Sequence, residues 1–226
     1  MTAYFVTATG TDIGKTFVTA GLIRHLRAQG RSVLAIKPIA SGFDMASAAE
    51  SDPGVLLEAL GDAVTPDALD RIAPWRFAAP LSPDMAAARE GKSLDFDAIV
   101  AFCRKAMAAK EGPLFIEGVG GLMVPLDHSK TVMDWMAAMN IPVILIAGSY
   151  LGTISHTLTA LECLARRGLN TRALVINQSD EGAVPLDETL ATLARFTGNL
   201  PIATIPRVRG AVDGAENFAA LWHTIG

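Results

Sequence analysis

Residues 4–16 read Tyr4-Phe5-Val6-Thr7-Ala8-Thr9-Gly10-Thr11-Asp12-Ile13-Gly14-Lys15-Thr16, and this stretch decides the fold. Its opening residues are β-branched or aromatic, which suits a strand buried on both faces. Gly10 and Gly14 allow the backbone to turn sharply and to approach a ligand closely. Lys15 then opens a helix that we expect to run to about Gln29. The stretch therefore predicts a strand, a tight loop and a helix start.

The predicted loop has the architecture of a phosphate-binding loop, in which backbone N–H groups and a helix N-terminus face an anion. In such a loop Lys15 would reach the β- and γ-phosphates, and the Thr16 hydroxyl would hold Mg²⁺. The strict pattern has a glycine where this chain has Thr9. The alternative is an ordinary glycine-rich turn with an exposed lysine, but the strand before the loop and the helix after it favour phosphate binding.

The bulk composition fits one α/β domain. The 226 residues are 50% hydrophobic and 6% aromatic, which suits helices packed on an aliphatic sheet. A net charge of −4 argues against a broad nucleic-acid surface. Residues 141–148 form the longest apolar run, which is too short to span a bilayer, and the first residues lack a signal-peptide pattern. We therefore expect a cytoplasmic protein with no membrane partner, in which Cys103 and Cys163 are reduced, buried thiols.

A second strand is predicted over residues 32–37, and it ends in the turn Lys37-Pro38-Ile39-Ala40-Ser41-Gly42. Ligands of a parallel sheet bind beyond the C-terminal ends of its strands. Lys37 and Ser41 are therefore expected at the same edge as the phosphate loop. The alternatives are a solvated strand-end lysine and an ordinary turn serine.

Two acidic residues are candidate metal ligands. Residues 113–121 predict an apolar strand that ends in Glu117 and continues into a glycine-rich loop. In phosphate-loop enzymes an acid at a neighbouring strand end holds Mg²⁺, so we prefer this role for Glu117 to that of a strand-end glutamate beside a flexible loop. Asp52 could be a metal ligand or a helix N-cap, and the local sequence favours the cap.

Two later strand ends carry polar groups. Residues 142–147 predict an apolar strand, followed near residue 152 by a helix that Thr153 or Ser155 could cap and whose free N–H groups would suit a carboxylate. His156 in that helix is expected to be structural or exposed. Residues 171–177 predict a strand that ends in Asn177-Gln178, whose amides could read a base edge or stabilise their own turn.

The remaining elements complete an alternation of strands and helices. We expect a last strand over residues 202–205, and helices over residues 55–60, 85–90, 96–109, 132–139, 187–196 and 216–225. Residues 43–53 look irregular, and residues 62–91 are rich in proline and alanine with poor periodicity. No linker, charge block or repeat interrupts the series, which predicts a single domain over residues 1–226 with a mostly parallel sheet.

These motifs together resemble the dethiobiotin synthetases of biotin biosynthesis, along nearly the whole chain. The motifs that carry the resemblance most strongly are Thr11-Asp12-Ile13-Gly14-Lys15-Thr16, Lys37-Pro38-Ile39-Ala40-Ser41-Gly42 and Glu117-Gly118-Val119-Gly120-Gly121-Leu122. Weaker support comes from Pro80-Leu81-Ser82-Pro83, Leu151-Gly152-Thr153-Ile154-Ser155-His156 and Ile205-Pro206. The resemblance implies a P-loop NTPase-like three-layer α/β/α fold. It also implies a homodimeric, Mg²⁺-dependent ligase that converts 7,8-diaminononanoate, CO₂ and ATP into dethiobiotin through a carbamate and a carbamic-phosphoric mixed anhydride.

The resemblance also implies site residues. Lys15 and Lys37 would be catalytic, and Thr11, Lys37 and Ser41 would contact the substrate. The implied metal ligands are Thr16, Asp52 and Glu117, which reverses the preference for Asp52 as a cap. The implied nucleotide contacts are Asp12, Ile13, Gly14, Lys15, Thr16, Phe17, Asp52, Glu117, Gly118, Val119 and Gly120, with the adenine held by Asn177, Gln178, Ile205, Pro206 and Arg207. The substrate carboxylate would be received across the dimer by Gly152, Thr153, Ile154 and Ser155.

Some positions depart from the family pattern, and two rival classes share parts of it. Ala8 and Gly10 alter the first turn of the loop, Asp84 stands where a histidine is common, and Gln178 stands where an aspartate is common. Partition ATPases usually carry an additional lysine where this chain has Gly10, and residues 218–223 of the last helix lack the basic residues of a membrane-binding tail. Cobyrinate-type ligases generally add a glutaminase domain, for which this chain has no room.

Overall fold

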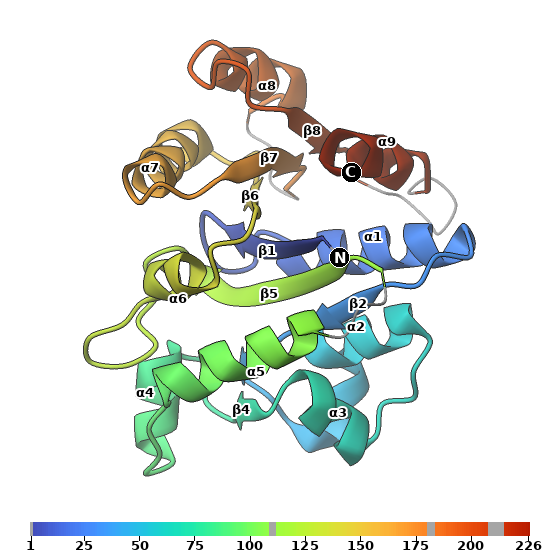
Figure 1. The fold of residues 1–226 in the computed structure, drawn as a ribbon. Coiled ribbons are helices and arrows are strands. Elements are labelled where there is room, and N and C mark those ends of the chain that lie inside the picture. Colours follow the sequence, from blue (N-terminus) through green and yellow to red (C-terminus); the bar gives the residue numbers. More distant parts are fainter. Residues whose placement is uncertain (1, 109–111, 180–183, 208–214) are drawn as a thin grey trace.

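The computed structural model describes residues 2–108, 112–179, 184–207 and 215–226. A parallel sheet of strand order β2-β5-β1-β6-β7-β8 forms its centre, and β3 pairs with β4 in a separate small sheet (Figure 1). The strands are β1 (Ala3–Ala8), β2 (Leu34–Ile36), β3 (Ile39–Ser41), β4 (Trp75–Phe77), β5 (Leu114–Gly121), β6 (Val143–Ala147), β7 (Thr171–Asn177) and β8 (Ile202–Ile205). The predicted mostly parallel sheet is therefore confirmed.

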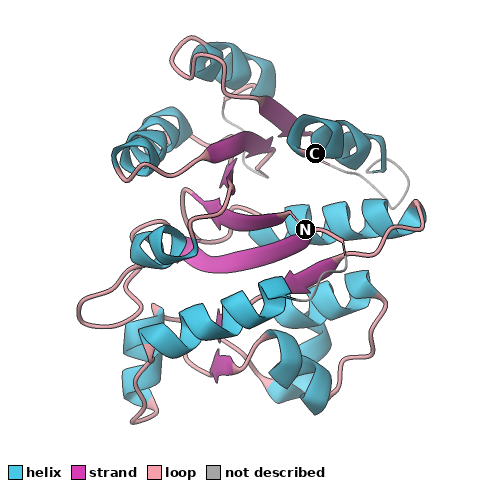
Figure 2. Cartoon of the chain, viewed as in Figure 1, coloured by secondary structure: helices cyan, strands magenta, loops and turns pink. Residues whose placement is uncertain are grey.

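Helices, drawn in cyan in Figure 2, pack on both faces of this sheet. They are α1 (Lys15–Ala28), the 3₁₀ helix η1 (Met45–Glu50), α2 (Asp52–Leu60), α3 (Pro66–Ile72), α4 (Pro83–Arg89), α5 (Phe96–Ala108), α6 (Val132–Met139), α7 (Thr153–Arg166), α8 (Leu186–Ala194) and α9 (Ala215–Ile225). Helix α1 contacts both α2 and α9, whereas α5 contacts α6. The chain thus forms the predicted three-layer α/β/α arrangement.

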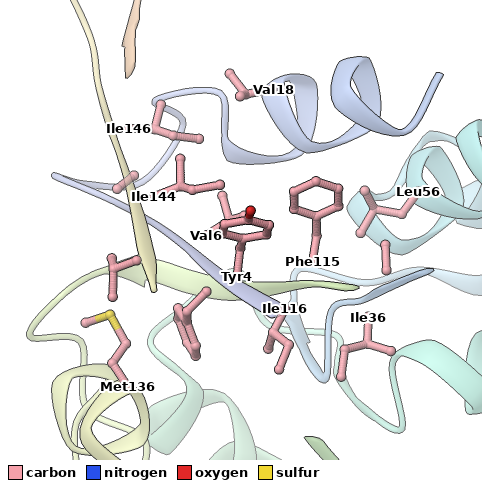
Figure 3. Packing of buried hydrophobic residues seen from close by; sticks show 14 of the residues in the cluster. Tyr4, Val6, Val18, Ile36, Leu56, Phe115, Ile116, Met136, Ile144 and Ile146 are labelled. Carbon is pink, nitrogen blue, oxygen red and sulfur yellow. The ribbon is translucent and has the colours of Figure 1, made fainter. Parts of the chain in front are cut away.

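Alternation along β1 assigns these helices to opposite faces of the sheet. Successive side chains of a strand point to opposite faces. Tyr4 packs edge-to-face on Trp222 of α9, while the next residue, Phe5, packs edge-to-face on Trp135 of α6. Figure 3 shows the same division further along the core, with Val18 of α1 and Met136 of α6 on either side of the strands. Burial on both faces explains why the strand sequences are continuously apolar.

The structure corrects several local predictions. The second strand covers only Leu34–Ile36 of residues 32–37, because Lys37 donates its backbone N–H to the Ile72 carbonyl, outside the central sheet. The stretch of poor periodicity contains α3, which buries Ala68, Leu69 and Ile72. The stretch taken as irregular contains η1. These elements are too short for periodicity to show.

The N-cap interpretation of Asp52 is wrong. Ser51 is the N-cap of α2, and its Oγ accepts a hydrogen bond from the Gly54 N–H at 3.3 Å. Asp52 is the first helical residue, and Pro53 follows it in the first turn, where proline is tolerated because a backbone N–H there would have no partner within the helix. The Asp52 carboxylate is therefore not used to cap α2.

Two further expectations can be compared with the structure. Cys103 and Cys163 are both free thiols; Cys103 is buried, as predicted, whereas Cys163 is only partly buried. Burial raises the pKa of the Cys103 thiol to about 12, so it stays protonated. Within the described ranges, no helix has the length and apolar character needed to cross a bilayer.

The start of α3 offers a test of the local fold far from the phosphate loop. The Thr65 side chain accepts a hydrogen bond from the Ala68 N–H at 3.2 Å and caps the helix. We predict that Thr65→Ala lowers the free energy of unfolding by about 1 kcal/mol, as measured by urea denaturation. Thr65→Ser keeps the hydroxyl and is the matched control. Equal stability of the alanine and serine variants would contradict the capping assignment.

Candidate functional site

The loop between β1 and α1 has the geometry of a phosphate cradle. Gly14 is the N-cap of α1 with φ 95°, and among the described residues no side chain caps this helix. Its first backbone N–H groups therefore remain available to an anion. Asp12 also has a left-handed backbone, with φ 56°, which is uncommon outside glycine and clusters at functional sites. The Lys15 Nζ folds back over the loop and donates to the Gly10 carbonyl at 3.3 Å.

A cavity of about 700 Å³ opens in front of this loop. It is bounded by residues from several separate parts of the chain, among them the phosphate loop, the segment after β2, the start of α2 and the end of β5. The predicted residues that line it are Thr11, Asp12, Gly14, Lys15, Thr16, Phe17, Lys37, Ser41, Asp52, Val119 and Gly120. Residues of the phosphate loop and of two neighbouring strand ends are thus brought together as predicted.

The wall of the cavity contains an ion cluster centred on the buried Lys37, in which Glu117 is also buried and Asp52 is half exposed. Its Nζ lies 2.8 Å from Glu117 Oε1 and 2.9 Å from Asp52 Oδ2, and it donates to the Gly118 carbonyl at 3.3 Å. The Thr16 hydroxyl donates to the same Glu117 Oε1 at 2.6 Å. Lys37 is 2% exposed and Glu117 is 0% exposed, so the solvated-lysine alternative is wrong.

Strand register explains why these two charges meet. In the parallel pair β2–β5, Ile36 lies opposite Ile116. Lys37 follows the last residue of β2, whereas Glu117 lies within β5, which continues to Gly121 and does not end at Glu117 as predicted. The two charged residues therefore lie at the same level of the sheet. A buried charge of this kind is tolerated because it is paired and hydrogen-bonded.

The two lysines of the site titrate differently. Burial alone would lower the pKa of Lys37, but the carboxylates of Glu117 and Asp52 outweigh it and raise the pKa above the ordinary value for lysine. Burial also lowers the pKa of Lys15, the nearby Lys37 charge lowers it further, and the resulting value is about 8. For Asp52, the effect of burial is outweighed by the Lys37 ammonium, which holds its pKa below the usual range. Lys37 is therefore a permanent cation, whereas Lys15 can lose its proton near neutral pH.

The oxygen atoms around Lys37 fit a hard divalent cation. The Glu117 Oε2 is buried and has no hydrogen-bond partner within the part of the chain that the structure describes. With the Thr16 hydroxyl and the Asp52 carboxylate it forms the all-oxygen donor set that Mg²⁺ prefers. No group of three or more His, Cys, Asp or Glu residues suited to a metal occurs among the described residues. Mg²⁺ at this point would depend on phosphate oxygens and water for its other ligands, as is usual at nucleotide sites.

The predicted adenine contacts gather at the ends of β7 and β8. Asn177 lies opposite Ile205 in the strand pairing. The Asn177 side chain donates to the Ile13 carbonyl of the phosphate loop at 3.0 Å, and Gln178 Oε1 accepts from the Arg207 backbone N–H at 2.8 Å. Both amides are thus engaged with other loops, so the alternative that they stabilise only their own turn is wrong.

Residues 152–155 do not line the cavity of their own chain. Gly152, with φ 97°, precedes α7, and neither Thr153 nor Ser155 caps that helix through its side chain. Instead the Thr153 hydroxyl donates to the Gly148 carbonyl at 2.7 Å, and the Tyr150 hydroxyl lies 2.9 Å from His156 Nδ1. As expected, His156 is exposed.

Sequence reasoning assigned no role to some residues of the cavity wall. Val124 and residues 80–83 also line the cavity; the proline-rich loop that contains residues 80–83 connects β4 to α4. The sequence does contain an indication for residues 80–83, because they belong to a long loop, and long loops in α/β chains often cover a site. Nothing in the local sequence of Val124, an apolar residue after a glycine-rich loop, marks it as a wall residue.

The fold and the site together define the class of P-loop NTPase-like proteins. A family model described as an AAA domain matches residues 2–213. The cell division ATPase MinD of Pyrococcus furiosus superimposes with a TM-score of 0.57 at 18% identity, over 100% of this chain and 98% of that one. At this identity the likeness concerns the fold.

Sequence relatives define the family. ATP-dependent dethiobiotin synthetase BioD of Acidiphilium cryptum (strain JF-5) is 52% identical over 202 residues, which are 89% of this chain and 91% of the relative. The protein of the same name from Methylobacterium nodulans is 47% identical over 203 residues, covering 88% and 90% of the two chains. The chain therefore belongs to the ATP-dependent dethiobiotin synthetase family. This assignment favours a synthetase over the partition-ATPase and cobyrinate-type alternatives.

The pKa of Lys15 leads to a prediction for nucleotide binding. In the free protein Lys15 is charged below about pH 8 and neutral above it. Bound phosphates would raise its pKa again, so binding takes up a proton when the pH is above this value. We predict that ATP binds roughly tenfold more weakly at about pH 9 than at about pH 7. Calorimetry in buffers of different ionisation enthalpy measures both the affinity and the proton uptake.

Lys15→Arg is the matched control, because arginine remains protonated over the whole range. The variant should bind ATP with little dependence on pH in this range. An unchanged affinity of the wild-type chain between the two pH values would contradict the lowered pKa.

Proposed function

We propose that this chain converts 7,8-diaminononanoate, CO₂ and ATP into dethiobiotin. The observation that carries the proposal is the placement of the Lys37 ammonium, which lies between Asp52 and Glu117 in the wall of the cavity that the phosphate loop faces. Family membership indicates the class of reaction. The position of the Lys37 ammonium fits the main requirement of that reaction. That requirement is positive charge beside the γ-phosphate of a bound nucleotide.

The proposed reaction needs no nucleophile from the protein. One substrate amine captures CO₂ as a carbamate, and the carbamate oxygen takes the γ-phosphoryl group from ATP, which releases ADP and gives a mixed anhydride. The second amine then attacks the carbonyl carbon, closes the cyclic urea and expels phosphate. The chain's task is therefore to align two reactants and to stabilise negative charge during transfer.

In this proposal the phosphate loop and the two lysines together align the reactants and stabilise the negative charge. The first N–H groups of α1 and the Lys15 ammonium bind the phosphate oxygens. Lys37 stabilises the charge that develops on the transferring group and on the carbamate. Both lysines are largely buried, with exposures of 7% for Lys15 and 2% for Lys37, so solvent screens their charges little.

Thr16, Asp52 and Glu117 are the residues proposed to hold Mg²⁺. Bound there, the ion would neutralise phosphate charge during the transfer. The unpaired Glu117 Oε2 supports this assignment, because a buried carboxylate oxygen without a donor is costly unless a cation or water fills the position. Ser41, whose buried Oγ likewise has no partner among the described residues, is proposed with Thr11 to contact the diamine.

The nucleotide base is proposed to lie near the ends of β7 and β8, outside the cavity wall described above. Gly118, Val119 and Gly120 would contact the nucleotide from the β5 side, and Asn177, Gln178, Ile205, Pro206 and Arg207 would surround the adenine. The proposed position of the adenine is supported by the contact between these two strand ends. The Gln178 side chain, at the end of β7, is hydrogen-bonded to the segment after β8. Because the family pattern has an acidic residue where Gln178 stands, this chain's contact to the base is expected to differ in detail.

A homodimer is proposed to complete the diamine site. The cavity of the same chain is not lined by Gly152, Thr153, Ile154 or Ser155. We propose that these residues receive the substrate carboxylate of the partner subunit. Leu151 and Met123 are large apolar residues with exposures of 82% and 60%, which is consistent with a covered surface. We propose that the chain acts as one catalytic domain in the cytoplasm.

The proposed role of Lys37 predicts a specific loss of activity. We predict that Lys37→Ala lowers kcat by roughly 10²-fold or more, as for other preorganised electrostatic groups. Lys105→Ala, which removes an exposed lysine of α5, is the control. Circular dichroism and ATP binding show whether the variant folds. Near-normal turnover of a folded Lys37→Ala protein would remove Lys37 from the catalytic role.

The reaction itself is tested by product formation. The chain is incubated with ATP, Mg²⁺, bicarbonate and 7,8-diaminononanoate, and the product mass is measured. We expect dethiobiotin together with one phosphate released for each product formed. Phosphate release that is independent of the diamine, without a cyclic urea product, would instead favour a nucleotide-dependent switch.

A further inference from the structure

The side-chain amide of Asn177 joins the end of β7 to the phosphate loop. Its Nδ2 donates to the Ile13 carbonyl at 3.0 Å, although 164 positions separate the two residues. The acceptor is a carbonyl oxygen, so only the NH₂ group of the amide can make this bond. In the central sheet β7 is separated from β1 by β6, so the amide reaches past a whole strand (Figure 1).

This hydrogen bond fixes the orientation of one peptide group. The Ile13 carbonyl belongs to the same peptide plane as the Gly14 N–H, and in a trans peptide the two groups point in opposite directions. No cis peptide occurs within the described ranges. Holding the carbonyl on the Asn177 side therefore directs the Gly14 N–H away from Asn177. Gly14 lines the cavity, so this N–H is a candidate phosphate donor.

The loop needs such an external contact. Left-handed residues stand on both sides of Ile13, Asp12 with φ 56° and Gly14 with φ 95°. In the described structure α1 receives no side-chain cap. The amide is also packed tightly, because a Cβ added to Gly14 would lie 2.3 Å from Asn177 Nδ2. The identity of Gly14 is therefore required both by the backbone and by the asparagine that packs against it.

We infer that Asn177 is a positioning residue for the phosphate loop, which holds the Ile13–Gly14 peptide so that the Gly14 N–H faces the phosphates. This inference rests on the proposed nucleotide site and goes beyond a contact to the base. The neighbouring amide has a different partner, since Gln178 accepts from the Arg207 backbone N–H after β8. Two consecutive residues at the end of β7 thus contact two different loops. Asn177 contacts the phosphate loop, and Gln178 contacts the loop proposed to hold adenine.

Inorganic tripolyphosphate separates these two roles, because it has phosphates but no base. We predict that Asn177→Ala weakens the binding of both Mg²⁺-tripolyphosphate and Mg²⁺-ATP, each by roughly three- to tenfold, the effect of losing one hydrogen bond. Weaker binding of tripolyphosphate is the decisive result, because a contact to the base cannot affect a ligand that has no base. Gln178→Ala is the matched control, and it should leave the affinity for tripolyphosphate unaltered.

A second variant tests the donor directly. Asn177→Leu keeps the approximate size of the side chain and adds no charge, but it has no N–H to offer Ile13. It should weaken tripolyphosphate binding at least as much as Asn177→Ala does, with the melting temperature measured for each protein. If one variant does not fold, the other decides the test.

The outcomes separate this inference from the proposed function. Wild-type affinity for tripolyphosphate in a folded Asn177 variant would overturn the positioning role and leave the nucleotide site intact. Weaker binding of Mg²⁺-ATP with wild-type affinity for tripolyphosphate would likewise overturn it and leave Asn177 with a base contact alone. Failure of the wild-type chain itself to bind tripolyphosphate would contradict the proposed phosphate site, and the inference would fall with it.

Discussion

The buried ammonium of Lys37 interacts with two carboxylates, and the rest of the site depends on this interaction. An isolated charge at this depth would be strongly unfavourable, but here Glu117 lies at 2.8 Å and Asp52 at 2.9 Å. The cluster connects the end of β2, the middle of β5 and the start of α2. Through Thr16, which donates to Glu117, it also contacts the first turn of α1. One set of charges therefore joins the phosphate loop to the end of β2 and to β5.

Sequence reasoning located the parts of this site but not their contacts. The strand, loop and helix around Lys15 could be predicted because glycines, a lysine and apolar runs act within a few residues of one another. That Lys37 and Glu117 lie at one sheet edge followed from the rule for parallel sheets. Their direct pairing depends on the register of β2 against β5, which no local pattern specifies. The contact of Asn177 with Ile13 is likewise a consequence of strand order.

The failures of local prediction have a similar origin. Aspartate is a residue type that often caps helices, yet Ser51 has that role here because α2 begins at Asp52, earlier than the predicted helix over residues 55–60. That shift leaves the Asp52 carboxylate available to Lys37. The short elements η1 and α3 were missed because each is only about two turns long, and packing against the remainder of the chain stabilises them. In this family member, the residue at which α2 begins thus determines that the Asp52 carboxylate can reach the site.

The central claim, that the Lys37–Glu117 pair holds the site together, is tested most directly by a double-mutant cycle on protein stability. The free energies of unfolding of the wild type, Lys37→Met, Glu117→Gln and the double variant give the coupling energy of the two side chains. A favourable coupling of about 1–3 kcal/mol is predicted for a buried, hydrogen-bonded ion pair. Additivity of the two single effects within about 0.5 kcal/mol would contradict the account, because it would mean that the two groups do not interact.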